Sequence, residues 1–208
     1  MSNLLFYRKQ KLLKPIIPFS REPGSGGRLV AQLVGKKLKY EFYDKNLIDL
    51  ISQQSGLEKD IVMNLDEQKE NTLTAILKRL FGKEPFPEQA YIRALSHTIL
   101  AIAAKGSSVV LGRGANFIAP EDKCLRVRII SPLVTRIRAH ALYDSHSEAE
   151  ARDSIRKIHF DRKDFVHKYF SKNISNTNYY DLVINTKRIK LADAADLVVK
   201  IYQERFRL

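Results

Sequence analysis

The 208-residue chain contains one cysteine, Cys124, and no tryptophan. A single cysteine excludes a disulfide framework and a cysteine-ligated zinc site, and it is typical of a protein from a reducing compartment. The apolar run at residues 4–7 is too short for the hydrophobic region of a signal peptide, and no apolar run approaches the length of a membrane span. These absences favour a cytoplasmic protein without a membrane partner.

The sequence also lacks the spacings that bind metals. None of the histidine pairs has a metal-ligand spacing, and no Ser-His-Asp arrangement can be identified; the histidines are His97, His140, His146, His159 and His167. We therefore expect no resident metal site formed by protein side chains alone. Repeats and low-complexity tracts are also absent, and 44% apolar residues at this length fit one domain. We expect a basic tail at residues 1–14 and a single domain at residues 15–208.

Charge is plentiful but uneven. The formal net charge is +13; residues 1–40 hold nine Lys or Arg and one acid, whereas residues 41–120 hold nine and ten. A basic field near the N-terminus would attract an anionic ligand. A solvated basic tail explains the same charge for Arg8, Lys9, Lys11 and Lys14. A nucleic-acid footprint is a third interpretation, but the chain lacks the recognition modules that accompany one.

The glycine-dense segment at residues 24–28 is the strongest local pattern. An apolar run precedes it, and a helical pattern with apolar residues on one face follows, so residues 16–38 predict strand, loop and helix. A loop around a helix start directs backbone N–H groups and the positive end of the helix dipole at one point, which suits a phosphate. Glycine allows positive φ and close backbone approach. A glycine turn that only packs the helix onto the strand is the alternative.

This loop departs from a strict Walker A motif, G-x-x-x-x-G-K-[ST]. If Gly26-Gly27 aligns with G-K, glycine replaces the lysine and Arg28 stands at the hydroxyl position. If Gly27-Arg28 aligns with G-K, Arg28 supplies the charge and Leu29 removes the hydroxyl that would hold magnesium. Arg28 is our candidate for the missing charge, and Ser25 or Ser20 for the missing hydroxyl.

Alternating patterns predict an α/β fold. We expect strands at residues 16–20, 40–44, 109–111, 125–130 and 181–185, and helices at residues 28–39, 45–54, 57–80, 91–104, 132–142, 147–170 and 191–206. Ser131 is the expected cap of the helix beginning at Pro132, and Ser147 with Glu150 forms an expected capping box. Strands separated by helices imply a parallel sheet that is covered on both faces.

In parallel sheets, ligands bind at the carboxyl ends of the strands. This rule selects the loop at 24–28, Asp44 after the second strand and Arg113 after the third. Arg113 is a candidate bidentate phosphate contact, or a partner for a nearby acid. Asp44 is a candidate contact to a substrate hydroxyl or to hydrated magnesium, or a helix N-cap.

The helix at 147–170 carries a row of cations, with Arg162 the first candidate. Such a helix could close over transferring phosphates and exclude water. The row also fits a solvated face whose cations pair with the interleaved acids.

Five segments together resemble the cytidylate-kinase-like branch of P-loop nucleoside monophosphate kinases. They are S-R-E-P-G-S-G-G-R at 20–28, F-Y-D-K-N-L-I at 42–48, V-V-L-G-R-G-A-N at 109–116, K-I-x-x-x-R at 157–162 with K-Y-F at 168–170, and Y-D-L-V-I-N-T at 180–186. The resemblance spans about residues 15–200. It implies a P-loop NTPase-type three-layer sandwich with a five-stranded parallel sheet, a helical substrate-binding insert at about 45–105 and a lid at about 145–172.

The resemblance also implies an activity and site residues. The implied activity is transfer of the γ-phosphoryl group of ATP, with Mg²⁺, to CMP, dCMP or a related nucleoside monophosphate. Carried over by position, Gly24, Ser25, Gly26, Gly27 and Arg28 become the ATP phosphate loop, Asp44 and Arg113 contact the monophosphate, and Arg162 is a lid cation. Arg28, Arg113 and Arg162 are the expected catalytic cations. The lysine-free loop leaves open a second class of function, a nucleotide- or phosphate-binding regulator with the kinase fold and little turnover.

Overall fold

The computed structural model describes residues 14–44, 88–145 and 147–207. Its elements run in the order β1 (Ile17–Arg21), α1 (Gly27–Leu38), β2 (Glu41–Tyr43), α5 (Glu88–Lys105), β3 (Ser108–Leu111), α6 (Ala115–Ile118), η1 (Glu121–Lys123), β4 (Val127–Ile130), α7 (Leu133–Asp144), α8 (Glu148–Phe170), η2 (Thr177–Tyr179), β5 (Leu182–Asn185) and α9 (Leu191–Phe206). The expected basic tail and the helices at 45–54 and 57–80 lie outside the described residues, as does much of the expected insert.

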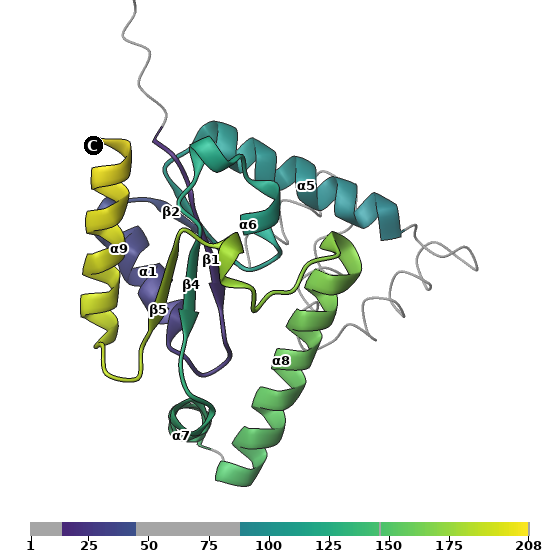
Figure 1. The fold of residues 1–208 in the computed structure, drawn as a ribbon, viewed down its shortest axis with the longest axis vertical. Coiled ribbons are helices and arrows are strands. Elements are labelled where there is room, and N and C mark those ends of the chain that lie inside the picture. The colour runs from purple at the N-terminus through teal and green to yellow at the C-terminus, as the bar shows by residue number, and fades with distance from the viewer. Residues whose placement is uncertain (1–13, 45–87, 146, 208) are drawn as a thin grey trace, which may run out of the picture.

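The five described strands form one parallel sheet in the order β2-β3-β1-β4-β5, which confirms the predicted α/β class. Because β1 is central, its carboxyl end lies between those of β3 and β4. In Figure 1 the strands point toward the end of the molecule where α7 lies. The loop after β1 and the turn after β3 therefore emerge at the same edge of the sheet, as we expected.

Helices cover both faces of the sheet. Alternate residues of β1 and β4, such as Phe19 and Ile129, pack in one apolar cluster with α1 and α9. Ile16 and Val110 point to the other face and pack with α5 and α6. Figure 1 shows α1 and α9 on one side of the sheet and α5, α6 and α8 on the other. The described part is thus a three-layer sandwich, and no helix in it has the length and apolarity to cross a membrane.

Pro18 lies inside the central strand, where proline is unusual because it cannot donate to a ladder. The backbone of Phe19 faces β3, since the Phe19 carbonyl accepts from Gly112 N–H. Pro18 therefore faces the β4 side, where Ile16 forms an isolated bridge with Cys124 and the ladder resumes at Phe19 and Val127. The strand thus tolerates proline at the point where its pairing with β4 is interrupted.

Two predicted helix starts had different outcomes. The Ser147 side chain accepts from Glu150 N–H, and the Glu150 carboxylate accepts from Ser147 N–H, so the capping box of α8 is confirmed. The predicted Ser131 cap of α7 is wrong: Pro132 occupies the N-cap position, and no side chain caps this helix. Ser131 is held elsewhere, because its backbone N–H donates to the Glu22 carboxylate at 3.0 Å.

Candidate phosphate-transfer site

The loop from Glu22 to Gly26 joins β1 to α1 and leaves the start of α1 open. Gly26 is the N-cap residue, no side chain caps the helix, and its first turn contains no acid. The first N–H groups of a helix have no partner within it, so an anion at this point would meet several donors and the positive end of the helix dipole. This geometry is compatible with the phosphate loop expected at 24–28.

Two of the three loop glycines have the expected backbone conformation. Gly24 and Gly26 adopt φ of +76° and +75°, which favour glycine. Gly27 is helical, and a Cβ there would lie 2.5 Å from Arg21 Cβ. The expectation of positive φ is therefore wrong for Gly27, which is required instead for close packing of α1 against β1.

The hydroxyl of Ser25 is engaged within the loop. It donates to the Glu22 carbonyl at 2.8 Å and lies 3.3 Å from the Ile129 carbonyl, and the side chain is buried. The Ser20 hydroxyl, our other candidate, is bonded to Arg128 Nη1 at 2.8 Å. Both hydroxyls therefore hold the loop and its strand in place. Ser25 donates its proton and keeps its lone pairs, whereas Ser20 accepts from Arg128 and from the Tyr180 hydroxyl.

Glu22 braces the loop from the other side. Its carboxylate lies 3.4 Å from the Nε of Arg136, a buried arginine of α7, and accepts from Ser131 N–H. Arg136 also donates to the carbonyls of Ser131 and Pro23, at 2.8 and 3.3 Å. A paired and hydrogen-bonded buried charge of this kind holds the loop in one conformation.

Arg28 and Asp44, both predicted site residues, meet in the structure. Arg28 Nη2 lies 2.7 Å from Asp44 Oδ2; 52% of the Arg28 side chain and 15% of the Asp44 side chain are exposed. The pair joins the first turn of α1 to the residue that follows β2. Arg28 therefore already has a counter-ion, and a phosphate ligand would share it or displace it.

Arg113 occupies a strained turn directly after β3. Gly112, Arg113 and Gly114 have φ of +85°, +54° and +68°, and a non-glycine residue rarely adopts such a conformation. The turn is held by the Gly112 N–H, which donates to the Phe19 carbonyl of β1 at 2.9 Å. Arg113 is thereby placed beside the end of the central strand, as predicted.

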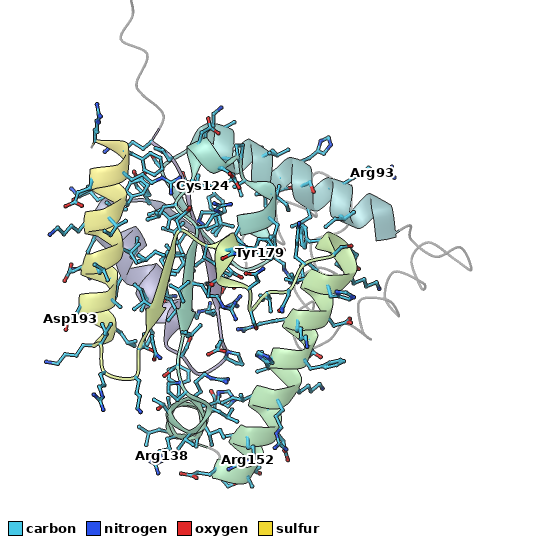
Figure 2. All side chains as sticks on the ribbon, in the orientation of Figure 1. Arg93, Cys124, Arg138, Arg152, Tyr179 and Asp193 are labelled. Atoms are coloured by element: carbon cyan, nitrogen blue, oxygen red, sulfur yellow. The ribbon has the colours of Figure 1, made fainter. Side chains whose placement is uncertain are left out.

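Helix α8, the predicted lid, contacts this turn through an aromatic ring. A Cβ on Gly114 would lie 2.2 Å from Phe170 Cε2, so Gly114 is the residue that lets the end of α8 pack on the turn. Phe170 also lies 5.3 Å, between ring centroids, from Phe117 of α6. Phe117 in turn contacts Tyr179, which Figure 2 labels in the segment between α8 and the sheet.

Arg162 of α8 reaches the end of β1. Its Nη1 donates to the Arg21 carbonyl at 3.0 Å, immediately before the loop that begins at Glu22. One turn earlier, burial lowers the pKa of His159; Glu22 opposes this shift, while the nearby arginines and Lys163 add to it. The predicted lid helix therefore lies over the carboxyl edge of the sheet with Arg162 facing the loop.

Sequence reasoning missed several polar residues at this edge. Four of them are buried, namely Ser131, Arg136, Asn116 and Arg128, and the fifth, Glu22, is partly buried. Ser131 Oγ and Asn116 Nδ2 have no hydrogen-bond partner among the described residues. One of the five, Arg128, had a usable signal, because an arginine inside the apolar strand V-R-I-I is unusual.

The residues that could contact a metal ion are few in this arrangement. The described residues contain no group of three His, Cys, Asp or Glu that could hold a metal ion. The Ser25 hydroxyl donates to the Glu22 carbonyl, and Asp44 Oδ2 lies 2.7 Å from Arg28 Nη2. Mg²⁺ commonly binds through substrate phosphates and water with one or two carboxylates, so Asp44 is the protein group that would contact it.

The fold and site thus combine a parallel α/β sheet, an open helix start and arginines at the carboxyl edge, an arrangement that suits an anionic ligand. A family model described as the cytidylate kinase-like family matches residues 16–188, and the chain belongs to this family.

Individual relatives are distant. A cytidylate kinase of Saccharolobus islandicus is 23% identical over 185 residues, 88% of each chain. A uronate isomerase of Corynebacterium glutamicum is 31% identical over 107 residues, which is 51% of this chain but only 21% of the isomerase. A solved structure of an uncharacterized protein from Eubacterium ventriosum has a TM-score of 0.67 at 20% identity, covering 91% of this chain and 99% of that one. The last likeness shows the fold alone.

Proposed function

We propose that this protein transfers the γ-phosphoryl group of ATP to a nucleoside monophosphate, with CMP and dCMP as the first candidates. Family membership supports a nucleotide kinase, and a distant relative is a cytidylate kinase. The observation that carries the proposal is the convergence of the open start of α1, the Arg113 turn and Arg162 on the end of β1.

Each residue has a role in this proposal. The N–H groups at Gly24 to Arg28 bind ATP phosphates, and Arg113 binds the phosphate of the acceptor. Arg162, on the lid, neutralises charge that develops on the transferring group. Phosphoryl transfer needs little covalent help from the protein, so positioning and charge neutralisation supply most of the rate enhancement. Asp44 is the proposed contact to the acceptor or to Mg²⁺, which accompanies the nucleotide.

A second candidate is a nucleotide-binding regulator with little turnover. It is favoured by one observation, namely that Arg28, the cation expected to replace the Walker lysine, is paired with Asp44. In this case ATP would bind to the loop, but no cation of the loop would neutralise the charge on the γ-phosphoryl group during transfer.

A coupled assay of ADP release separates the two. We expect release that depends on one member of a panel of nucleoside monophosphates, CMP and dCMP included. Arg113→Met should lower kcat/KM for the acceptor by about 100-fold while ATP affinity stays the same, because a charge-assisted phosphate contact is lost. Tight ATP binding without release for any acceptor in the panel would favour the regulator.

A further inference from the structure

Arg128, in the middle of β4, is a buried cation without a carboxylate partner. Only 3% of the surface of Arg128 is exposed. Its side chain donates to Ser20 Oγ at 2.8 Å and lies 3.4 Å from Tyr180 Oη, and its guanidinium lies 5.3 Å from the centre of the Tyr180 ring. All of these partners are neutral, and no acid within the described residues forms an ion pair with Arg128.

Two other arginines near Arg128 have carboxylate partners. Arg136, also buried, pairs with Glu22. Arg126, two residues before Arg128, pairs with Asp181 at 3.1 Å and with Glu121 at 2.6 Å. A buried charge is costly unless it is paired, so a guanidinium with only neutral partners has unused capacity for an anion.

Arg128 lies on the strand next to β1, near the carboxyl end of β1. It stands opposite Ser20 in the β1–β4 register, on the sheet face opposite the α1 and α9 core. The carbonyl of the next residue, Arg21, accepts from Arg162 of α8. Two guanidinium groups, one from a strand and one from the lid helix, thus hold consecutive residues of β1 just before the loop begins.

We propose that Arg128 binds a phosphate oxygen of the acceptor nucleotide; this inference rests on the proposed function. Arg113 follows β3 and Arg128 belongs to β4, and these strands flank β1 at a separation of about 10 Å, two strand spacings. Two arginine side chains can reach one phosphate from both sides of β1 across this distance. Among the described residues, the hydrogen bonds of the Arg128 guanidinium come from Nη1, so its other N–H groups would make the phosphate contact.

Thermal unfolding with and without CMP tests the assignment, with cytidine as the probe that lacks the phosphate. We expect CMP to raise the Tm of the wild-type protein and cytidine to do so less. Arg128→Met, which removes the charge at similar volume, should leave the Tm of the free protein unchanged or higher and weaken CMP binding about tenfold or more. Its ATP-induced shift should persist. Arg128→Lys should weaken CMP binding less.

Arg126→Met is the matched control, because Arg126 lies near Arg128 in sequence but is fully paired. It should lower the Tm and leave the CMP-induced shift unchanged. The proposal is overturned if the CMP-induced shift persists undiminished in Arg128→Met, whatever the Tm of the free variant, or if neither CMP nor inorganic phosphate stabilises the wild-type protein. Arg128-dependent CMP binding without acceptor-dependent ADP release would support the inference and contradict the proposed kinase activity.

Discussion

Arg28 and Asp44 form a 2.7 Å ion pair that joins the start of α1 to the end of β2. Both residues were predicted separately as ligand contacts, one for ATP and one for the acceptor. Their pairing links the two proposed subsites. A ligand that binds to one of the two residues weakens the ion pair and so changes the electrostatic environment of the other.

Asp44→Asn should separate a binding role from a stabilising one. The pair is partly exposed, so its loss should change the free energy of unfolding by less than about 1 kcal/mol. We expect the acceptor KM to rise about tenfold, since a charged hydrogen-bond partner is removed. Steady-state kinetics with varied acceptor and varied ATP measure this. Asp196→Asn, which breaks the exposed Lys37–Asp196 pair, is the control and should leave both KM values unchanged.

Gly24→Ala should destabilise the protein by about 1–3 kcal/mol, because the new Cβ would lie 2.5 Å from the Arg136 carbonyl oxygen at a φ of +76°. Urea unfolding measures the loss. Gly35→Ala is the matched control within α1, where the nearest atom to a new Cβ is at 3.6 Å. It should stabilise by about 0.5–1 kcal/mol, since alanine favours helix. Equal effects at the two positions would contradict the packing argument.

Gly114 and Phe170 should be energetically coupled. Gly114→Ala places a methyl group 2.2 Å from the Phe170 ring, so Phe170→Ala removes the obstacle. We expect the double variant to be less destabilised than the sum of the single variants by about 1 kcal/mol or more, measured as a double-mutant cycle in urea. Additive effects would show that the turn bearing Arg113 and the end of α8 are independent.

Asp181 should make the protein sensitive to acid. Burial raises the pKa of its carboxyl, but hydrogen bonds from Arg126 and Arg205 outweigh burial and hold the pKa below its ordinary value of 3.8. A lowered pKa means that the stabilisation is complete above this value and disappears as the pH falls through the folded-state pKa. Asp181→Asn should therefore be less stable than wild type at pH 6, and the difference should shrink below pH 3.8. Urea unfolding at several pH values measures it; a constant difference would contradict this assignment.

Local patterns were the most predictable features of this protein. Ser147 and Glu150 cap α8 as predicted, because a capping box is formed by residues three apart. Ser131 and Pro132 form an equally clear local pattern, yet Ser131 does not cap α7. Its backbone N–H is held by Glu22, from a segment more than 100 residues earlier, and only the fold brings these residues together.

In the candidate site, too, some features were predictable from the sequence and others depended on the fold. Gly24, Asp44 and Arg113 were located because residues that follow parallel strands share one edge of the sheet. The pairing of Arg28 with Asp44 was not predicted, since either residue had a plausible role without the other. The buried arginines Arg128 and Arg136 were missed as site residues, because burial of a charge depends on what packs over it.

The sequence by itself determined the α/β class, most strand and helix positions and the edge of the sheet at which the candidate residues meet, because these follow from hydrophobic periodicity and glycine placement. Tertiary structure alone decided which charges pair and which stay without a carboxylate. Arg126 has two carboxylate partners, while Arg128, two residues later, has none among the described residues. That difference arises because ion pairs depend on distances between segments far apart in the chain, and no local pattern records those distances.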